Sequence, residues 1–284
     1  ISAVSYTGSQ VGIITDTRHG EARIVDIRPV RLLEALESDK IVVVAGFQGV
    51  SIDKEITTLG RGGSDTTAVA LAAAIDADRC ELMKDVDGLY SADPSVVPQA
   101  RCIEKADYES ALRLCRSGTV ALQPEAVRIA QEHRVPLGVG NTAKNAIGTI
   151  ITDAPYDSGE VVGIARRDHL VREQGVGQAI QRGDMVRLTE HRGRWVLWRE
   201  GRRGEQAPLS ALSLVTSGRP VPGLPEAVRE RLDTEGIADA GYIESPEEFW
   251  VSVRTDQADA AVRSLHELCV QMGWIQTGAP REVR

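Results

Sequence analysis

The chain has 284 residues, of which 42% are hydrophobic and 4% aromatic, and it carries a formal net charge of −8 at pH 7. A chain of this length and hydrophobicity buries a large core, and we expect two domains rather than one. The negative charge argues against a nucleic-acid-binding protein, because DNA and RNA require a clustered basic surface. Glutamates interrupt the arginines between residues 192 and 203, so we interpret that region as a solvated surface.

The four cysteines form no C-x-x-C pair, which indicates reduced thiols and a cytoplasmic location. No apolar segment approaches the roughly 20 residues of a membrane helix, so we predict no membrane association. The histidines show no ligand spacing, and we predict no protein-held metal. The chain begins at Ile1, without a methionine, in a strand-like run that extends to Tyr6. We therefore expect the native protein to have a further amino-terminal segment.

The first half of the chain alternates apolar strand-like runs with helical patterns, which predicts an α/β fold. Residues 40–45 are β-branched and apolar on both faces, as in a central parallel strand. This run ends at a turn with Gly46 and Gly49, where backbone can approach a ligand closely. An alanine-rich helix is predicted over residues 66–76, with Ser64 or Asp65 as its N-cap. Further strands are predicted at 80–83, 135–139 and 149–152, and further helices at 108–116 and 125–133.

The segment from Gly60 to Asp65 reads Gly-Arg-Gly-Gly-Ser-Asp and leads into the alanine-rich helix. Backbone N–H groups and the helix dipole favour an anion there, and Arg61 adds a two-pronged donor that matches a carboxylate. Asp65 would orient a cationic amino group or cap the helix. The glycine spacing alone fits a structural turn equally well, and it matches neither the dinucleotide fingerprint nor the Gly-Lys-Ser/Thr phosphate loop.

Two acidic residues, Asp85 and Asp87, precede Gly88. No glutamate follows at the spacing of a calcium loop, so a type I turn is favoured over a metal site. After residue 160 the pattern changes to an α+β module, with helices on one face of an antiparallel sheet. Its strands are predicted at 210–216 and 249–254, the latter half-buried, and its helices at 225–233 and 256–272. The last helix places Val262, Leu265, Cys269 and Met272 on one stripe.

Several segments, in this order, are similar to aspartate kinase, a member of the amino-acid kinase superfamily: residues 6–16, 45–50, 57–65, 85–88 and 92–94. The resemblance is dense over about residues 1–152. It implies a partial three-layer α/β sandwich over residues 1–155, followed by an α+β ACT-like regulatory region over residues 156–284. The first ACT-like unit, at about 161–205, is shortened and lacks its second helix, and the second spans about 208–275.

The resemblance implies transfer of the ATP γ-phosphoryl group to the side-chain carboxylate of L-aspartate, giving 4-phospho-L-aspartate, with Mg²⁺ as cofactor. This reaction begins the routes to lysine, threonine, methionine and diaminopimelate. Arg61 and Asp65 are implied to be catalytic, and Arg61, Gly62, Gly63 and Ser64 to bind aspartate. The implied ATP-binding residues are Gly46, Gly49, Lys84, Asp85, Tyr90, Ser91, Ala92, Asp93, Pro94 and Ser95.

The ACT-like region implies a homo-oligomer and an amino-acid effector such as lysine, threonine or diaminopimelate. The implied effector loop contains Ser217, Gly218, Pro222 and Gly223. A kinase acting on glutamate or carbamate is disfavoured by this appended region.

Several positions depart from the family pattern. Lys84 stands where the family has Thr or Ser, Ser95 and Glu125 where it has Arg, and Val120 where it has a lysine near the ATP phosphates; Gly138 and Gly140 replace arginines. Most of these changes remove positive charge beside a polyanionic substrate. The alternative is therefore a catalytically impaired paralogue, a regulatory or assembly subunit that senses an amino acid. We predict negligible kinase activity for the isolated chain.

Overall fold

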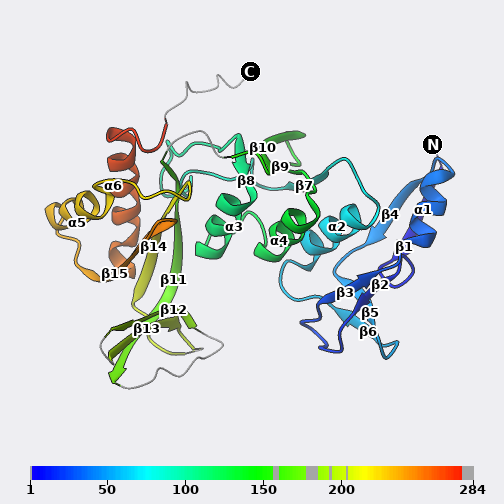
Figure 1. The fold of residues 1–284 in the computed structure, drawn as a ribbon, viewed down its shortest axis with the longest axis horizontal. Helices are drawn as coiled ribbons and strands as arrows, with labels where there is room; N and C mark the ends of the chain where they lie inside the picture. Colours follow the sequence, from blue (N-terminus) through cyan, green and yellow to red (C-terminus); the bar gives the residue numbers. More distant parts are fainter. Residues whose placement is uncertain (1, 156–159, 177–184, 192–193, 203, 277–284) are drawn as a thin grey trace. The chain divides into compact units, whose positions relative to one another are not determined.

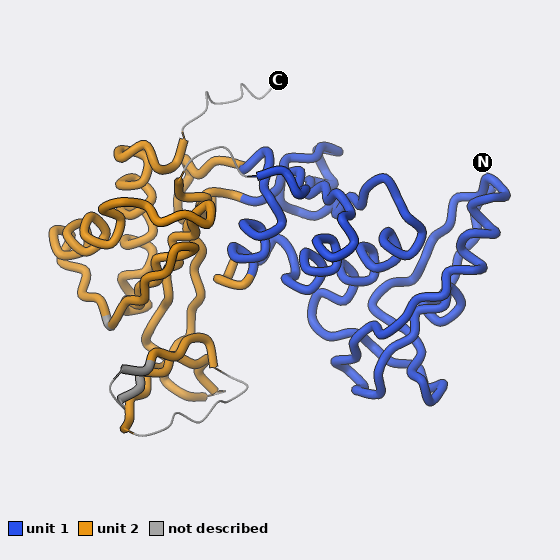
Figure 2. Tube along the Cα trace, in the orientation of Figure 1, with its two compact units in different colours: residues 1–89, 103–115, 120–155 blue, residues 90–102, 116–119, 156–284 orange. Residues whose placement is uncertain are grey.

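The computed structural model describes residues 2–155, 160–176, 185–191, 194–202 and 204–276. They divide into two compact units, which Figure 2 shows in different colours. The first unit holds residues 1–89, 103–115 and 120–155, and the second holds residues 90–102, 116–119 and 156–284. The division therefore differs from a single boundary at residue 155, because two short segments of the first half pack with the second unit. The domain boundary itself stays a prediction.

The first unit contains three small sheets and four helices (Figure 1). The sheets are β1 (Ala3–Thr7) with β4 (Ile41–Ala45); β3 (Ile24–Ile27), β2 (Ile13–Thr15), β5 (Gln48–Ser51) and β6 (Ile56–Thr58); and β7 (Cys80–Lys84), β9 (Leu137–Asn141), β10 (Ala146–Thr152) and β8 (Lys105–Asp107). The helices are α1 (Val30–Glu37), α2 (Gly63–Ala74), α3 (Tyr108–Ser117) and α4 (Pro124–His133). Parallel pairs join β1 to β4 and β7 to β9, so the predicted α/β class is confirmed.

The expectation that residues 40–45 form a central strand buried on both faces is wrong. Within the described residues β4 pairs only with β1, and its side chains alternate between half-buried and exposed positions. Ile41 is 52% exposed and Val43 57% exposed. Helix α1 packs against β4, and it covers the alternate positions only. An apolar run without alternation thus does not establish burial of both faces.

The second unit is built on one antiparallel sheet in the order β12-β13-β11-β14-β16-β15. Its strands are β11 (Val161–Val176), β12 (Met185–His191), β13 (Arg194–Glu200), β14 (Leu209–Thr216), β15 (Asp239–Ser245) and β16 (Glu248–Arg254). The helices α5 (Leu224–Thr234) and α6 (Ala258–Gln271) pack against each other, and α6 contacts β11, β14 and β16. The predicted α+β arrangement is confirmed. The described residues of 161–205 contain no helix, so both ACT-like segments contribute to a single sheet.

The core of this unit lies between the sheet and its helices. Phe249, Val251 and Val253 point into it together with Leu265 of α6. On the opposite face of the sheet Trp250 packs edge-on against Trp198, with ring centroids 4.8 Å apart. Strand β16 is therefore buried on both faces rather than half-buried as predicted. The predicted stripe on α6 holds for its buried members Val262, Leu265 and Cys269, whereas Met272 is 53% exposed because α6 ends at Gln271.

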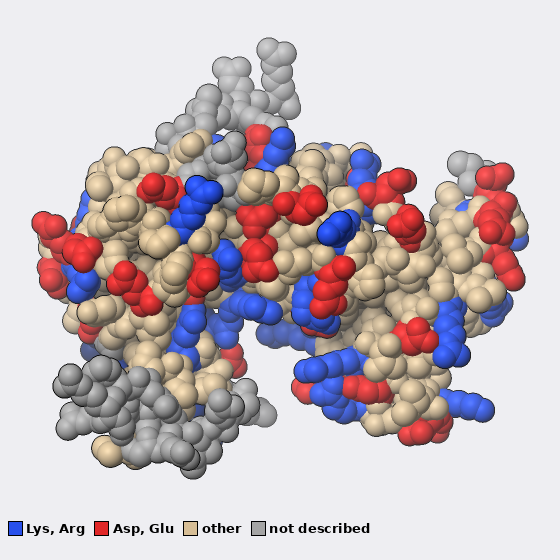
Figure 3. All heavy atoms as spheres, viewed as in Figure 1, with Lys and Arg blue, Asp and Glu red and all other residues tan. Residues whose placement is uncertain are grey.

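Charged side chains of both signs intermingle on the face drawn in Figure 3. One of the arginines assigned to a solvated surface is placed differently: the Arg199 side chain is only 6% exposed and pairs with Glu173 and Glu205, each at 2.6 Å. At this position the alternating charges therefore form an ion triad around a buried arginine, with both glutamates partly exposed. None of the helices in the described part of the chain is long and apolar enough to cross a membrane.

Candidate functional site

The loop before α2 owes its shape to Gly62. This residue has φ +74°, and a Cβ atom added to it would lie 1.8 Å from Cγ of Gln123. The positive φ favours glycine, and any larger residue would also have to displace the Gln123 side chain. Gly62 is also the N-cap residue of α2, in the left-handed conformation. The prediction of Ser64 or Asp65 as N-cap is therefore wrong, because the helix begins one turn earlier, at Gly63.

Asp65 instead forms an ion pair with Lys84 at the end of β7. The Lys84 Nζ atom donates to both carboxylate oxygens, at 2.9 and 2.8 Å. The Asp65 side chain is 13% exposed and that of Lys84 23% exposed. A residue assigned to the aspartate site and one assigned to the nucleotide site are thus in direct contact. The low exposure strengthens their attraction relative to a surface pair.

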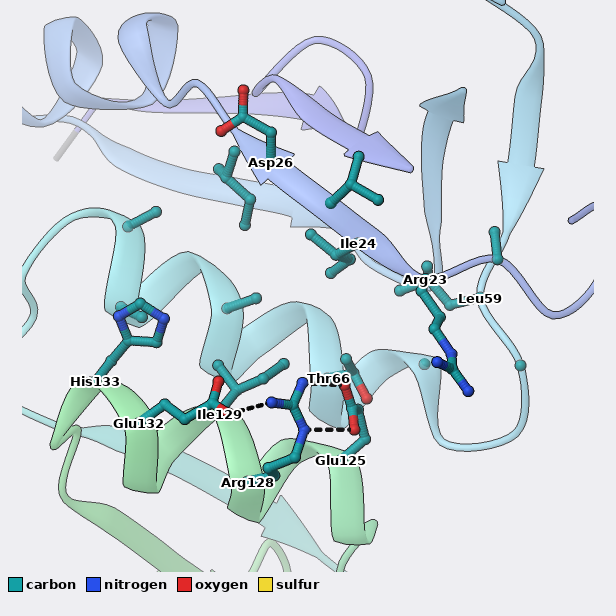
Figure 4. A pocket seen from close by; sticks show the side chains of 18 of the residues that line it. Arg23, Ile24, Asp26, Leu59, Thr66, Glu125, Arg128, Ile129, Glu132 and His133 are labelled. Atoms are coloured by element: carbon teal, nitrogen blue, oxygen red, sulfur yellow. Dashed lines mark hydrogen bonds and ion pairs between the residues drawn. The ribbon is translucent and has the colours of Figure 1, made fainter. Parts of the chain in front are cut away.

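Arg61 lines a cavity of about 610 Å³ bounded by the β3 segment, α2 and α4. Figure 4 shows the apolar side chains of Ile24 and Leu59 on one wall and the two helices on the other. Arg128 of α4 is held between Glu125 and Glu132. The hydrogen bonds that Arg128 donates to Glu125 and Glu132 raise the pKa of its guanidinium above its usual value.

Two further arginines of this cavity, Arg23 and Arg61, have no ion pair within the described residues. The cavity lining includes Gly63 but neither Ser64 nor Asp65. In this loop Arg61 therefore lines the cavity, whereas Asp65 lies outside it and contacts Lys84.

The first turn assigned to the nucleotide contains Gly46 and Gly49. A Cβ atom on Gly49 would lie 2.8 Å from Cγ2 of Thr15 and 2.9 Å from the carbonyl oxygen of Ile13, so packing on β2 explains this glycine. Between the two glycines, Phe47 has φ +69° and is 41% exposed. A positive φ is strained for an aromatic residue and marks candidate functional positions. Sequence reasoning missed Phe47, and only the flanking glycines drew attention to the turn.

The two acidic residues of the turn after β7, Asp85 and Asp87, have different surroundings. Asp87 accepts hydrogen bonds from Nδ2 of Asn141, at 2.9 Å, and from Nζ of Lys144, at 2.8 Å. Asp87 therefore stabilises the β7–β9 end of the sheet, and Asp85 next to Lys84 is the acid that remains for a ligand. No group of three or more His, Cys, Asp or Glu side chains that would hold a metal occurs among the described residues.

The remaining residues assigned to the nucleotide, Tyr90 to Ser95, begin the segment of the first half that packs with the second unit. Ser91 and Ala92 are each 2% exposed. The backbone N–H and the hydroxyl of Ser95 both donate to Asp93 Oδ1, at 2.8 and 2.6 Å. In this turn only Asp93, Pro94 and Ser95 are exposed.

Comparison with known proteins gives these residues a family context. Residues 1–141 match the sequence profile of the amino acid kinase family. The chain belongs to the amino acid kinase family. An aspartokinase of Corynebacterium glutamicum is 50% identical over 168 residues, which cover 57% of this chain and 40% of that protein. The chain thus spans less than half the length of this curated relative.

Two solved structures share the fold of the chain. Aspartokinase III of E. coli in complex with aspartate and ADP covers 95% of this chain and 70% of its own, with a TM-score of 0.82 and 20% identity. The same enzyme with lysine and aspartate gives a TM-score of 0.70 at 23% identity, covering 94% of this chain and 69% of its own. The fold therefore extends across both units of this amino acid kinase family member.

Two departures from the family pattern now have a structural setting. Val120, at the position expected to carry a lysine near the ATP phosphates, is 89% exposed. At Gly140, where an arginine is usual, a Cβ atom would lie 2.2 Å from the carbonyl oxygen of Ala146. Arginine would not fit at Gly140 without a shift of β10.

The loop assigned to an effector lies beside a smaller cavity, of about 340 Å³, in the second unit. Pro220, Val221, Leu224, Glu244 and Phe249 are among its lining residues. Ser217, Gly218, Pro222 and Gly223 do not line it, although they are neighbours in the chain of residues that do. Their role as effector ligands stays a prediction.

Proposed function

We propose that the chain functions in aspartate kinase chemistry, in which the γ-phosphoryl group of ATP is transferred to the side-chain carboxylate of L-aspartate to give 4-phospho-L-aspartate. The observation that carries the proposal is the Gly60–Asp65 loop. It lies within the residues that match the amino acid kinase profile, directs Arg61 to a cavity and pairs Asp65 with Lys84. The aspartate and ADP in the aspartokinase III structure support this choice of ligands.

The reaction requires positioning more than proton transfer. A side-chain carboxylate with a reference pKa near 3.9 is already ionised at pH 7, so no general base is needed. Two mutually repelling anions must instead be held together while charge develops on the phosphoryl group. The planar guanidinium of Arg61 matches a carboxylate of aspartate, and Gly62 and Ser64 offer backbone N–H groups at the start of α2. The backbone N–H of Gly63 instead donates to the carbonyl oxygen of Gly60 at 3.0 Å, so Gly63 would contribute close backbone approach.

On the nucleotide side, we assign phosphate contacts to Lys84 and, as the family resemblance implies, to the turn that begins at Tyr90. Asp65 fixes the Lys84 ammonium group, whose charge offsets that of the phosphates. Mg²⁺ binds proteins through one or two carboxylates together with substrate phosphates, which fits the single carboxylate of Asp85. Asp85 would hold Mg²⁺ together with the phosphates, and the ion would neutralise part of their charge.

A second candidate function is a sensor or assembly subunit without catalysis. The exposed valine at position 120 favours it, because the resemblance implies a lysine near the ATP phosphates at that position. In either role, the second unit would bind an amino-acid effector and join copies of the chain. The lysine in the second aspartokinase III structure makes lysine the first effector to test.

Calorimetric titration of the full-length protein, rather than of the isolated chain, with ATP–Mg²⁺ and with L-aspartate separates these functions. Binding of both ligands, with ATP-dependent phosphorylation of aspartate, supports the kinase, whereas aspartate binding alone supports the sensor. Arg61→Ala should weaken aspartate binding about tenfold or more, because it removes two charge-assisted hydrogen bonds from the guanidinium to a carboxylate of aspartate. Arg79→Ala removes an arginine that is 70% exposed and paired with Glu81, and it should leave aspartate binding unchanged. A chain that binds neither ligand contradicts both functions.

A further inference from the structure

The segment from Tyr90 to Cys102 is part of the core of the second unit. Ala92 and Val97 lie in the same apolar cluster as Ile164 of β11 and Leu265 of α6. The backbone N–H of Ile164 donates to the carbonyl oxygen of Ser91 at 2.8 Å. The position of this segment is therefore set by β11 and α6, far along the chain from it.

One side-chain hydrogen bond ties the segment to α6. The Oγ atom of Ser91 lies 3.0 Å from Nε2 of His266, a residue 175 positions away in the chain. Ser91 is 2% exposed and His266 1% exposed. The backbone N–H of Arg101 donates to the same Oγ at 2.9 Å. Ser91 Oγ therefore accepts from the Arg101 N–H and also bonds to Nε2 of His266, which links the segment to α6 in either tautomer of the ring.

The second ring nitrogen of His266, Nδ1, shows that placing a histidine here costs folding free energy. His266 Nδ1 is buried and has no hydrogen-bond partner among the described residues. Burial also lowers the pKa of His266, so the ring is neutral near pH 7. A buried polar atom without a partner costs free energy that an apolar residue of similar size would avoid. Packing alone therefore gives no reason for histidine at this position, whereas the bond to Ser91 does.

We infer that His266 is a positioning residue: it holds the Tyr90–Ser95 turn in the conformation that the nucleotide requires, so that α6 of the second unit sets nucleotide affinity. The nucleotide part of this inference rests on the proposed function, which assigns the turn to ATP. The positional part stands on the Ser91–His266 bond and the shared core.

The test compares His266→Leu, which removes the bond, with His266→Gln, whose amide reaches the same place. Ser264→Ala is the matched control, because Ser264 is a 7% exposed neighbour on α6 that bonds to Glu235 instead. Ser91→Ala removes the bond from its other end and substitutes for His266→Leu if that variant does not fold. Because Ser91→Ala also removes the acceptor of the Arg101 N–H, only exchange at residue 91 is compared in that variant. Each chain is measured by amide hydrogen exchange and by titration with ADP–Mg²⁺ and with L-aspartate.

In His266→Leu, the amides of Ser91 and Arg101 should exchange about tenfold faster, and ADP should bind about tenfold more weakly, as expected for one lost hydrogen bond. Aspartate affinity should stay unchanged. His266→Gln should recover most of both effects, and Ser264→Ala should show neither.

Unchanged exchange in both His266→Leu and Ser91→Ala, or equal acceleration in Ser264→Ala, would overturn the inference. Faster exchange with unchanged ADP affinity would overturn its nucleotide part. A parent chain that binds no ADP would refute the proposed nucleotide site and that part with it, and the exchange rates would still decide the positional part.

Discussion

The Asp65–Lys84 pair joins the first turn of α2 to the last residue of β7. Both side chains are largely buried, so each would be an uncompensated charge without the other. Asp65 also lies in the first turn of α2, where the helix dipole attracts a negatively charged side chain. These effects make the pair a structural contact as well as a candidate functional one.

Its strength can be measured with Lys84→Met, Asp65→Asn and the double variant. Each single substitution should lower the free energy of unfolding by about 1–3 kcal/mol, since it leaves a poorly solvated partner. The double variant should lose less than the sum, with a coupling of about 1 kcal/mol in urea denaturation. The exposed pair Arg79–Glu81 is the control and should couple by less than about 0.5 kcal/mol. Additive effects at positions 65 and 84 would contradict a buried pair.

At the residue scale, sequence patterns located this site but did not resolve its contacts. The run of glycines identified the loop that holds Arg61, and its position before an alanine-rich stretch predicted α2. The N-cap could not be predicted, because Gly62 is required by a contact with Gln123 of a distant segment. The Lys84 contact was missed for the same reason: the sequence separates two residues that the sheet and the helix bring together.

Strands β11 and β13 show how pairing between strands buries charge. Glu173 of β11 and Glu205 of the loop after β13 both accept hydrogen bonds from the Arg199 guanidinium. Hydrogen bonding from Arg199 lowers the pKa of Glu205 to about 2. The sequence pattern predicted a solvated surface, since alternating charges usually lie in water. Only the antiparallel pairing of β11 with β13 places Arg199 beneath its partners.

This triad predicts how stability depends on pH. The folded pKa of Glu205 lies below its ordinary value of 4.5, so the contribution of Glu205 to stability is complete above about pH 4.5 and disappears as the pH falls through about 2. The Tm of the parent chain should therefore exceed that of Glu205→Gln at pH 7, and the two should converge between pH 4.5 and 2. Glu230→Gln, at an exposed glutamate of α5 with no ion pair in the described residues, is the control. A pH-independent difference in Tm would argue against the ion pair.

At the scale of the whole molecule, the boundary between the two compact units does not coincide with the end of the segment that matches the family profile. The profile match ends at residue 141, yet residues 90–102 inside it pack with the second unit. Long helices and strands such as α4 and β14 were predictable from periodicity, whereas the three- and four-residue strands β2, β3, β5 and β6 were too short to show one. The packing of residues 90–102 was also beyond prediction, because its contacts join the segment to β11 and α6 rather than to its neighbours in the chain.

Two large-to-small substitutions test this division. Leu265→Ala removes a fully buried side chain from the core that contains Ala92 and Val97, and Leu82→Ala makes the matched change in β7 of the first unit. Each should cost about 2–5 kcal/mol by leaving a cavity. In native-state amide exchange, Leu265→Ala should lower the protection of residues 90–102 together with that of β14 and β16, because these segments share one core. Leu82→Ala should lower the protection of β7 and β9 and leave residues 90–102 protected. If residues 90–102 lose protection with β7 in Leu82→Ala but not with β14 in Leu265→Ala, they belong energetically to the first unit.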